Sequence, residues 1–200
     1  MAYRLDYYMN PTSPWTFLGH ARLREICALH NVAIALKPVD VVGRVFPASG
    51  GLPLAKRAPQ RQQYRLIELE RWAALRELPL KLQPKHFPVP GHEASRLIIA
   101  CDQVHDTDEA MELAYRLMYA LWCQDRDLED PKTLQQICRE AELDPNPLFQ
   151  RIPDTHQVFD AYTKEAIAAG VFGMPWYVYR GQPFWGQDRL ELMAAAMARD

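Results

Sequence analysis

The spacing of apolar residues changes twice along this 200-residue chain, and that change constrains the fold more than any other feature of the sequence. Residues 3–9 are rich in aromatic side chains and predict a strand, and a helix is expected from Pro14. Residues 32–37 form a short apolar run that ends at Pro38, which favours a second strand. This β-α-β order is compatible with two parallel strands joined by a right-handed crossover.

Helical spacing dominates the middle of the chain. Residues 43–62 are rich in Gly, Pro, Arg and Gln and predict a long loop. After this loop, Tyr64, Ile67 and Leu75 begin an apolar helical stripe. A cleaner stripe follows at Ala94, Leu97, Ile98, Cys101 and Val104. Together with the stripes after it, this pattern predicts an all-helical module of roughly a hundred residues, a normal size for a domain.

The last part of the chain returns to strands. A helix is expected over residues 155–169 with Gly170 at its C-terminus, and residues 175–179 predict a strand that opens on a proline. A turn leads to a second strand at Phe184, and Asp188 is placed to cap a final helix. This α-β-β-α order completes the β-α-β of the first part.

The two ends of the chain are therefore expected to meet in one sheet. We predict that residues 1–41 and 155–200 form an α/β domain, and that residues 42–154 form a helical domain inserted into it. No internal repeat or low-complexity segment interrupts this division.

Composition and charge argue against several kinds of partner. A formal net charge of −2 gives no basic surface for nucleic acid or an anionic membrane, and no apolar run approaches the length of a membrane span. The N-terminus lacks a basic-then-apolar signal pattern, so a cytoplasmic location is expected. Neither cysteines nor histidines show a metal-ligand spacing, so no metal is predicted. The cysteines are interpreted as buried free thiols: Cys27, Cys101, Cys123 and Cys138.

Several short motifs follow one another through nearly the whole chain. They are Ser13–Gly19 (Ser-Pro-Trp-Thr-Phe-Leu-Gly), Tyr64 with Glu68–Ala73, Phe87-Pro88, Ala120–Trp122, Gly170–Pro175 and Gly186–Leu190. In this order the chain resembles 2-hydroxychromene-2-carboxylate isomerases and kappa-class glutathione transferases, in which the first motif reads Ser-Pro-aromatic-x-aromatic-Leu. The resemblance implies an α/β, thioredoxin-like fold of the DsbA type with a large all-helical insertion, in a branch without Cys-x-x-Cys.

Ser13 stands where a redox enzyme of this fold would carry its cysteine pair. The start of a helix presents free N–H groups and the positive end of the helix dipole, and so stabilises a nearby thiolate. Because the chain has no cysteine there, the resemblance implies that the sulfur comes from glutathione, to which the Ser13 hydroxyl donates a hydrogen bond. Ser13-Pro14 is also a common N-cap followed by proline, and one serine can serve both purposes.

The resemblance assigns further residues to glutathione. Pro175 matches the cis-proline of thioredoxin-like folds, so the Met174 backbone would pair with the cysteinyl part of the tripeptide; the alternative is a proline that starts an edge strand. Arg61 corresponds to the family's lysine for the glycyl carboxylate. The turn before the last helix is assigned to the γ-glutamyl end, although Asp188 is alternatively only a cap. Its residues are Trp185, Gly186, Gln187 and Asp188.

The substrate side departs from the family pattern. Gly51 stands where the family commonly has Asn, and Phe46 replaces a basic residue of the naphthalene-pathway isomerases. Residues 89–91 (Val-Pro-Gly) replace a polar stretch. Trp15, Phe46 and Gly51 are predicted to face the organic substrate, and these changes favour a different or bulkier, more apolar molecule.

The function implied by the resemblance is that of a glutathione-dependent cis-trans isomerase of an aromatic degradation intermediate. Ser13 is its catalytic candidate, and the thiolate would add reversibly to the substrate. Two alternatives stay open: a kappa-class-like glutathione transferase or peroxidase, and a non-catalytic glutathione-binding module. The expected partner is a small aromatic molecule, and the resemblance also implies a homodimer.

Overall fold

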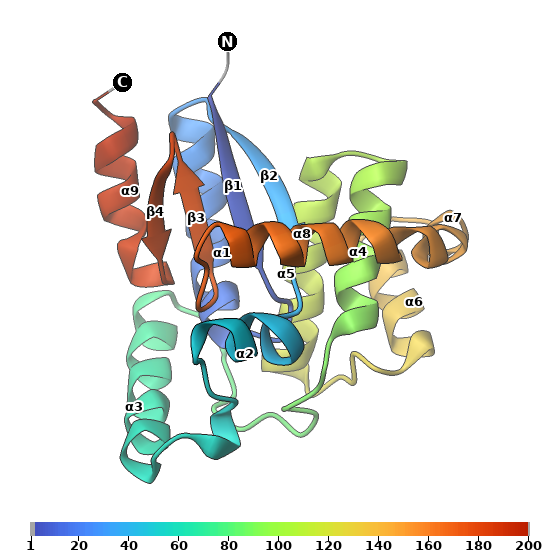
Figure 1. Cartoon of the computed structure of the whole chain (residues 1–200). Coiled ribbons are helices and arrows are strands. Elements are labelled where there is room, and N and C mark those ends of the chain that lie inside the picture. Colours follow the sequence, from blue (N-terminus) through green and yellow to red (C-terminus); the bar gives the residue numbers. More distant parts are fainter. Residues whose placement is uncertain (1–2, 200) are drawn as a thin grey trace.

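The computed structural model describes residues 3–199 and contains a four-stranded sheet in the order β2-β1-β3-β4 (Figure 1). β1 (Arg4–Met9) pairs parallel with β2 (Ala33–Pro38). On its other side, β1 pairs antiparallel with β3 (Trp176–Tyr179), which forms a hairpin with β4 (Gln182–Trp185). The two ends of the sequence therefore meet in one sheet, and the predicted β-α-β and β-β connections are confirmed.

Helices cover both faces of this sheet. α1 (Pro14–Leu29) and α9 (Leu190–Met197) pack on one face, while α8 (His156–Ala168) crosses the other (Figure 1). Successive strand residues point to opposite faces, so Tyr7 packs in the α1 core and Tyr8 in the α8 core. Both faces are apolar, as expected for a sheet covered on two sides.

A buried lysine ties α8 to the sheet. Lys37 on β2 is only 6% exposed, and its ammonium lies 2.8 Å from Asp6 and 2.6 Å from Glu165 on α8. The Tyr8 hydroxyl donates to the same Glu165 carboxylate at 2.8 Å. A charge removed from water is stable only when it is paired in this way, so the network fixes α8 and the segment that follows it.

The inserted part of the chain is helical, as predicted. Its helices are α2 (Phe46–Ser49), α3 (Pro59–Leu75), α4 (His92–Val104), α5 (Thr107–Gln124), α6 (Pro131–Glu140) and α7 (Pro145–Arg151). α4 and α5 pack against β2, and one apolar core runs from the sheet into these helices. The boundaries at 42 and 154 stay a prediction, and the core is continuous across both.

The long loop predicted over residues 43–62 is wrong. The segment contains a π-helical turn (Val41–Val45), α2, a 3₁₀ turn (Leu54–Lys56) and the first turn of α3. Pro47 and Pro59 lie in the first turns of α2 and α3, where a missing N–H costs nothing, and Pro53 directly precedes the 3₁₀ turn. Gly50 ends α2 in the left-handed conformation. Pro47, Gly50 and Pro59, which favoured a loop in the sequence, therefore stand at the ends of short helices.

The inward face of α3 also differs from the prediction. Tyr64, Ile67 and Leu75 are exposed, whereas Leu69 and Ala73 are buried against Leu18 of α1. The cysteines are free, and all but Cys123 are fully buried, as predicted. In the described part of the chain, no helix is long and apolar enough to cross a membrane.

Candidate functional site

Ser13 is held at the start of α1 by a tight turn after β1. The buried Asn10 side chain accepts hydrogen bonds from the N–H (2.8 Å) and the hydroxyl (2.7 Å) of Thr12, and the Ser13 N–H donates to the Asn10 carbonyl (3.1 Å). The Ser13 Oγ then accepts from the Thr16 N–H at 3.3 Å. Ser13 is therefore the N-cap that the Ser-Pro pair predicts, with Pro14 as the first helical residue.

The cap leaves hydrogen-bond donors unused at the start of α1. A hydroxyl that accepts one hydrogen bond keeps its own hydrogen to donate, and residues 3–199 offer no acceptor for it. The N–H of Trp15 also finds no acceptor in the described part of the chain. The first turn of α1 carries no acidic side chain, so no carboxylate within that turn neutralises the positive end of the helix dipole. The arrangement favours an anion beside Ser13.

The sheet register brings Met174 and Pro175 to the same end of the sheet. Tyr8 of β1 faces Trp176 of β3, so the residues that precede Trp176 lie beside those that follow Tyr8. The Met174–Pro175 bond is cis, as predicted. Within residues 3–199, neither the N–H nor the C=O of Met174 has a backbone partner, whereas the Pro175 carbonyl accepts from the Gly186 N–H at 2.9 Å.

The turn after β4 reaches this end of the sheet as well. Gln187 is 2% exposed and packs on α1. The contact is close, because a Cβ added at Gly19 would lie 2.7 Å from the Cβ of Gln187. The cap predicted for Asp188 is wrong, because a 3₁₀ turn (Gln187–Arg189) intervenes and Arg189 takes the cap position of α9. The half-exposed Asp188 carboxylate instead pairs with the Arg189 guanidinium.

The three residues predicted to face the organic substrate occupy two clusters. Trp15 packs beside Leu18 and Leu69, between α1 and α3. Phe46 packs on the α8 side of the sheet, and Gly51 lies directly beneath its ring. A Cβ at Gly51 would lie 2.3 Å from a Phe46 ring carbon, which explains why no side chain stands at position 51. Trp15 and Phe46 thus belong to different apolar clusters.

Arg57 and Arg65, which were not predicted as site residues, lie four residues before and after the predicted Arg61. Arg61 is exposed in the first turn of α3, and neither it, Arg57 nor Arg65 pairs with an acidic side chain of residues 3–199. Their spacing of four residues was the available signal for one basic surface.

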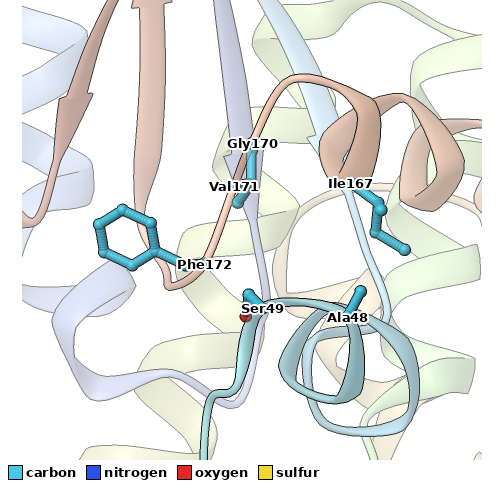
Figure 2. A pocket seen from close by; sticks show the side chains of 6 residues that line it. All are labelled: Ala48, Ser49, Ile167, Gly170, Val171 and Phe172. Carbon is cyan, nitrogen blue, oxygen red and sulfur yellow. The ribbon is translucent and has the colours of Figure 1, made fainter.

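Trp185 lies in an exposed aromatic group rather than in a closed site. It is 51% exposed, and its ring meets that of Phe172 edge to face at 4.7 Å. Beside this group, a shallow pocket of about 330 Å³ lies between α2 and the segment after α8 (Figure 2). Its lining has no titratable side chain and no predicted site residue: Ala48, Ser49, Ile167, Gly170, Val171 and Phe172. We assign no chemistry to this pocket.

The altered segment at residues 89–91 packs directly on the Ser13 turn. Gly91 has a φ of 69°, and a Cβ there would lie 2.5 Å from Cγ2 of Thr12. Its N–H donates to the Glu129 carboxylate at 3.0 Å. The Phe87–Pro88 bond in the same segment is a second cis peptide that the sequence reading did not predict. Position 91 thus supports the turn that carries Ser13.

We expect Gly91→Ala to destabilise the protein by about 2–3 kcal/mol, because the new Cβ meets both a left-handed backbone and the Thr12 side chain. Gly181→Ala is the matched control, since Gly181 has a similar φ of 76° and nothing within 4 Å of its Cβ position. That control should cost about 1 kcal/mol. Urea unfolding of both variants measures the difference. Equal losses in the free energy of unfolding would show that the Thr12 side chain moves aside without strain.

The geometry defines a class of protein: a thioredoxin fold in which a serine cap replaces the redox cysteine pair at the start of α1. Residues 4–198 match the family model described as DSBA-like thioredoxin domain, and the chain belongs to this family. The predicted fold class and family resemblance are confirmed.

The relatives carry two kinds of enzyme name. The chain is 25% identical over 195 residues to a 2-hydroxychromene-2-carboxylate isomerase of Sphingobium xenophagum, covering 96% of this chain and 97% of the relative. It is also 25% identical over 207 residues to glutathione S-transferase kappa 1 of Rattus norvegicus, covering 95% and 88%.

Solved structures agree on the fold. A 2-hydroxychromene-2-carboxylate isomerase structure superposes with a TM-score of 0.84 at 22% identity, covering 98% of this chain and 95% of that one. The cytosolic disulfide reductase DsbM of Pseudomonas aeruginosa, solved with GSH, superposes with a TM-score of 0.68 at 13% identity, covering 98% and 100%.

Proposed function

We propose that this protein is a glutathione-dependent cis-trans isomerase of an aromatic compound. The observation that carries the proposal is the Ser13 hydroxyl, which is fixed by the Thr16 N–H and keeps its hydrogen for an acceptor at the start of α1. When bound, glutathione supplies a thiol that adds to a conjugated carbon, allows rotation about the former double bond and is then expelled. The name of the Sphingobium relative supports this reaction.

Ser13 has one role in this proposal, which is to hold negative charge on sulfur. Its O–H and the Trp15 N–H point toward one end of α1, where the helix dipole adds a partial positive charge. Donors that are already positioned cost no reorganisation when charge develops, so they stabilise the thiolate more than water would. No basic side chain is needed to remove the thiol proton once the thiol pKa is lowered in this way.

Three further groups suit the rest of the tripeptide. The unpaired N–H and C=O of Met174 can form strand-like hydrogen bonds with an extended peptide. Among residues 3–199, the exposed Asp188 forms an ion pair with Arg189 alone. Such surface pairs exchange partners at little cost, so its carboxylate is available to an ammonium. The exposed Arg61 offers a guanidinium to the glycyl carboxylate. The name of the rat relative, glutathione S-transferase kappa 1, supports glutathione as the ligand.

Calorimetric titration with glutathione, followed by absorbance of the bound thiolate near neutral pH, tests the site without requiring turnover. We expect binding and a thiol pKa below that of free glutathione. Isomerisation of 2-hydroxychromene-2-carboxylate should then proceed with catalytic amounts of glutathione, and mass spectrometry should find no conjugate. Absence of glutathione binding would overturn the proposal.

The same experiment separates the alternatives. A released conjugate would identify a kappa-class-like transferase, whose name one relative carries. Glutathione binding without turnover over a panel of aromatic substrates would favour a binding module. The cytoplasmic location and the homodimer stay predictions.

A further inference from the structure

Tyr177 on β3 carries a hydroxyl that is buried in the core between the sheet and α1. Its side chain is 0% exposed, and its ring stacks on that of Tyr7 with the ring centres 5.4 Å apart. The Tyr7 hydroxyl pairs with Nδ1 of His20 at 3.1 Å, but the Tyr177 hydroxyl has no hydrogen-bond partner within residues 3–199. Burial is the main cause that raises the pKa of Tyr177, so the hydroxyl keeps its hydrogen and can donate it.

Gln187 brings an unpaired acceptor to the same place. Its side-chain carbonyl oxygen is buried and has no partner among the described residues. A Cβ added at Gly19 would lie 2.7 Å from the Gln187 Cβ and 3.1 Å from the Tyr177 hydroxyl. Both groups therefore lie against one point of α1, and the flexible glutamine amide is long enough to meet the hydroxyl directly or through a water molecule.

Thr16 adds a third unpaired polar group to this interface. Its side chain is 0% exposed, and its Oγ1 atom has no partner in the described part of the chain. Thr16 lies three residues before Gly19 on α1, at a neighbouring position of the helix surface. Its N–H is also the donor that holds the Ser13 Oγ at 3.3 Å. Buried polar groups are rarely left unpaired, so three of them close to Gly19 indicate one polar cluster inside an apolar core.

This cluster lies between the two ends of the proposed glutathione site. Gln187 begins the short 3₁₀ turn that carries Asp188. The backbone before this turn is held by Gly186, whose N–H donates to the Pro175 carbonyl at 2.9 Å. The buried Gln187 side chain contacts α1, and so it fixes Asp188 relative to Ser13 at the start of that helix.

We propose that Tyr177 is a positioning residue for glutathione: its hydroxyl donates to the side-chain carbonyl of Gln187, and this pair holds Asp188 in place relative to Ser13. The γ-glutamyl ammonium and the thiol are then bound at the same time, and the preorganised site gains affinity for the whole tripeptide. Pairing also removes the cost of burying a donor and an acceptor without partners. The inference rests on the proposed function for the identity of the ligand.

Titration calorimetry of the full chain with glutathione and with the dipeptide Cys-Gly tests this role, because Cys-Gly carries the thiol but lacks the γ-glutamyl end. We expect Tyr177→Phe to weaken glutathione binding about five- to tenfold and to change Cys-Gly binding by less than about twofold. Turnover at saturating glutathione should stay within about twofold of that of the unmodified protein. In the Gln187→Met background, Tyr177→Phe should have no further effect on glutathione, since the acceptor for the hydroxyl is gone.

Tyr7→Phe is the matched control, since it removes a buried hydroxyl from the same aromatic stack, but one that pairs with His20. It should lower the urea midpoint and leave the ratio of glutathione affinity to Cys-Gly affinity unchanged. An equal loss of both ligands in Tyr177→Phe, an unchanged glutathione affinity, or a full effect in the Gln187→Met background would overturn the inference. A higher urea midpoint in Tyr177→Phe would do the same, because it would show that the hydroxyl is buried without a partner.

Failure of the unmodified protein to bind glutathione would contradict the proposed function. The urea midpoints of Tyr177→Phe, Gln187→Met and the double variant then decide the pairing without any ligand. We expect the double variant to lose less than the two single variants together. Losses that add in full would show that the hydroxyl and the amide do not interact.

Discussion

Ser13→Ala is expected to lower glutathione-dependent turnover about a hundredfold, the usual cost of removing one positioned donor to a developing anion. The variant loses the O–H that, in the proposed function, would donate to the glutathione sulfur, but it keeps the helix dipole and the Trp15 N–H. Turnover should therefore fall and not vanish. Because the donor acts on the thiolate and not on the peptide backbone, the dissociation constant of glutathione should change much less. The pKa of the bound thiol, followed by thiolate absorbance, should rise.

Two controls separate this role from the N-cap. Loss of the Thr16 N–H acceptor should cost about 1 kcal/mol of stability in Ser13→Ala, measured by urea unfolding. Ser13→Thr keeps both the cap and a hydroxyl, and should recover most of the turnover. If Ser13→Ala turns over at the full rate, or if Ser13→Thr is as slow as the alanine variant, the serine is only a cap.

The local features of the site could be predicted from the sequence because short spacings determine them. The Ser13 cap needs only residues within one turn of α1, and the Met174–Pro175 bond follows from a motif before a strand. Asp188 shows the limit of such reasoning. A cap and a 3₁₀ turn have similar local sequences, and the packing of Gln187 on α1 decides between them.

Long-range packing explains the rest. The inward face of α3 is set by Leu18 of α1, so the apolar Tyr64 stripe lies outside and Arg65 lies inside. The surroundings of Arg65 come from Phe87 and Trp122, which lie on other elements. No pattern within α3 reports this environment. The glycine at position 51 is likewise explained only by the Phe46 ring that packs against it in the folded protein.

Protonation of the buried His20 is expected to cause the largest change of stability with pH. It is fully buried on α1, its Nε2 lies 2.9 Å from the Met111 carbonyl, and its Nδ1 lies 3.1 Å from the Tyr7 hydroxyl. A carbonyl can only accept, so Nε2 carries the proton of the neutral ring and Nδ1 accepts from Tyr7. Burial lowers the pKa of His20 from 6.5 to about 4, although the Met111 hydrogen bond opposes that shift.

The folded protein therefore binds a proton at His20 less readily than the unfolded chain does. The stability provided by the neutral imidazole is fully present above pH 6.5 and is lost as the pH falls toward 4. A difference of this size between the two pKa values corresponds to about 3 kcal/mol. Urea unfolding between pH 7 and pH 4 should show this loss on top of that from the carboxylates. Because α1 carries both His20 and Ser13, glutathione binding should also be lost where acidification unfolds the protein.

His20→Gln isolates the contribution of the imidazole, since the amide can accept from Tyr7 and donate to Met111 without titrating. Whatever its stability at pH 7, its free energy of unfolding should fall by about 3 kcal/mol less on acidification than that of the unmodified protein. The exposed His156→Gln should retain the original pH dependence. The same acid loss in His20→Gln as in the unmodified chain would mean that His20 accepts its proton in the folded state. The core between β1, α1 and α5 would then admit water or a counter-charge, since a buried imidazolium without either is too costly to persist.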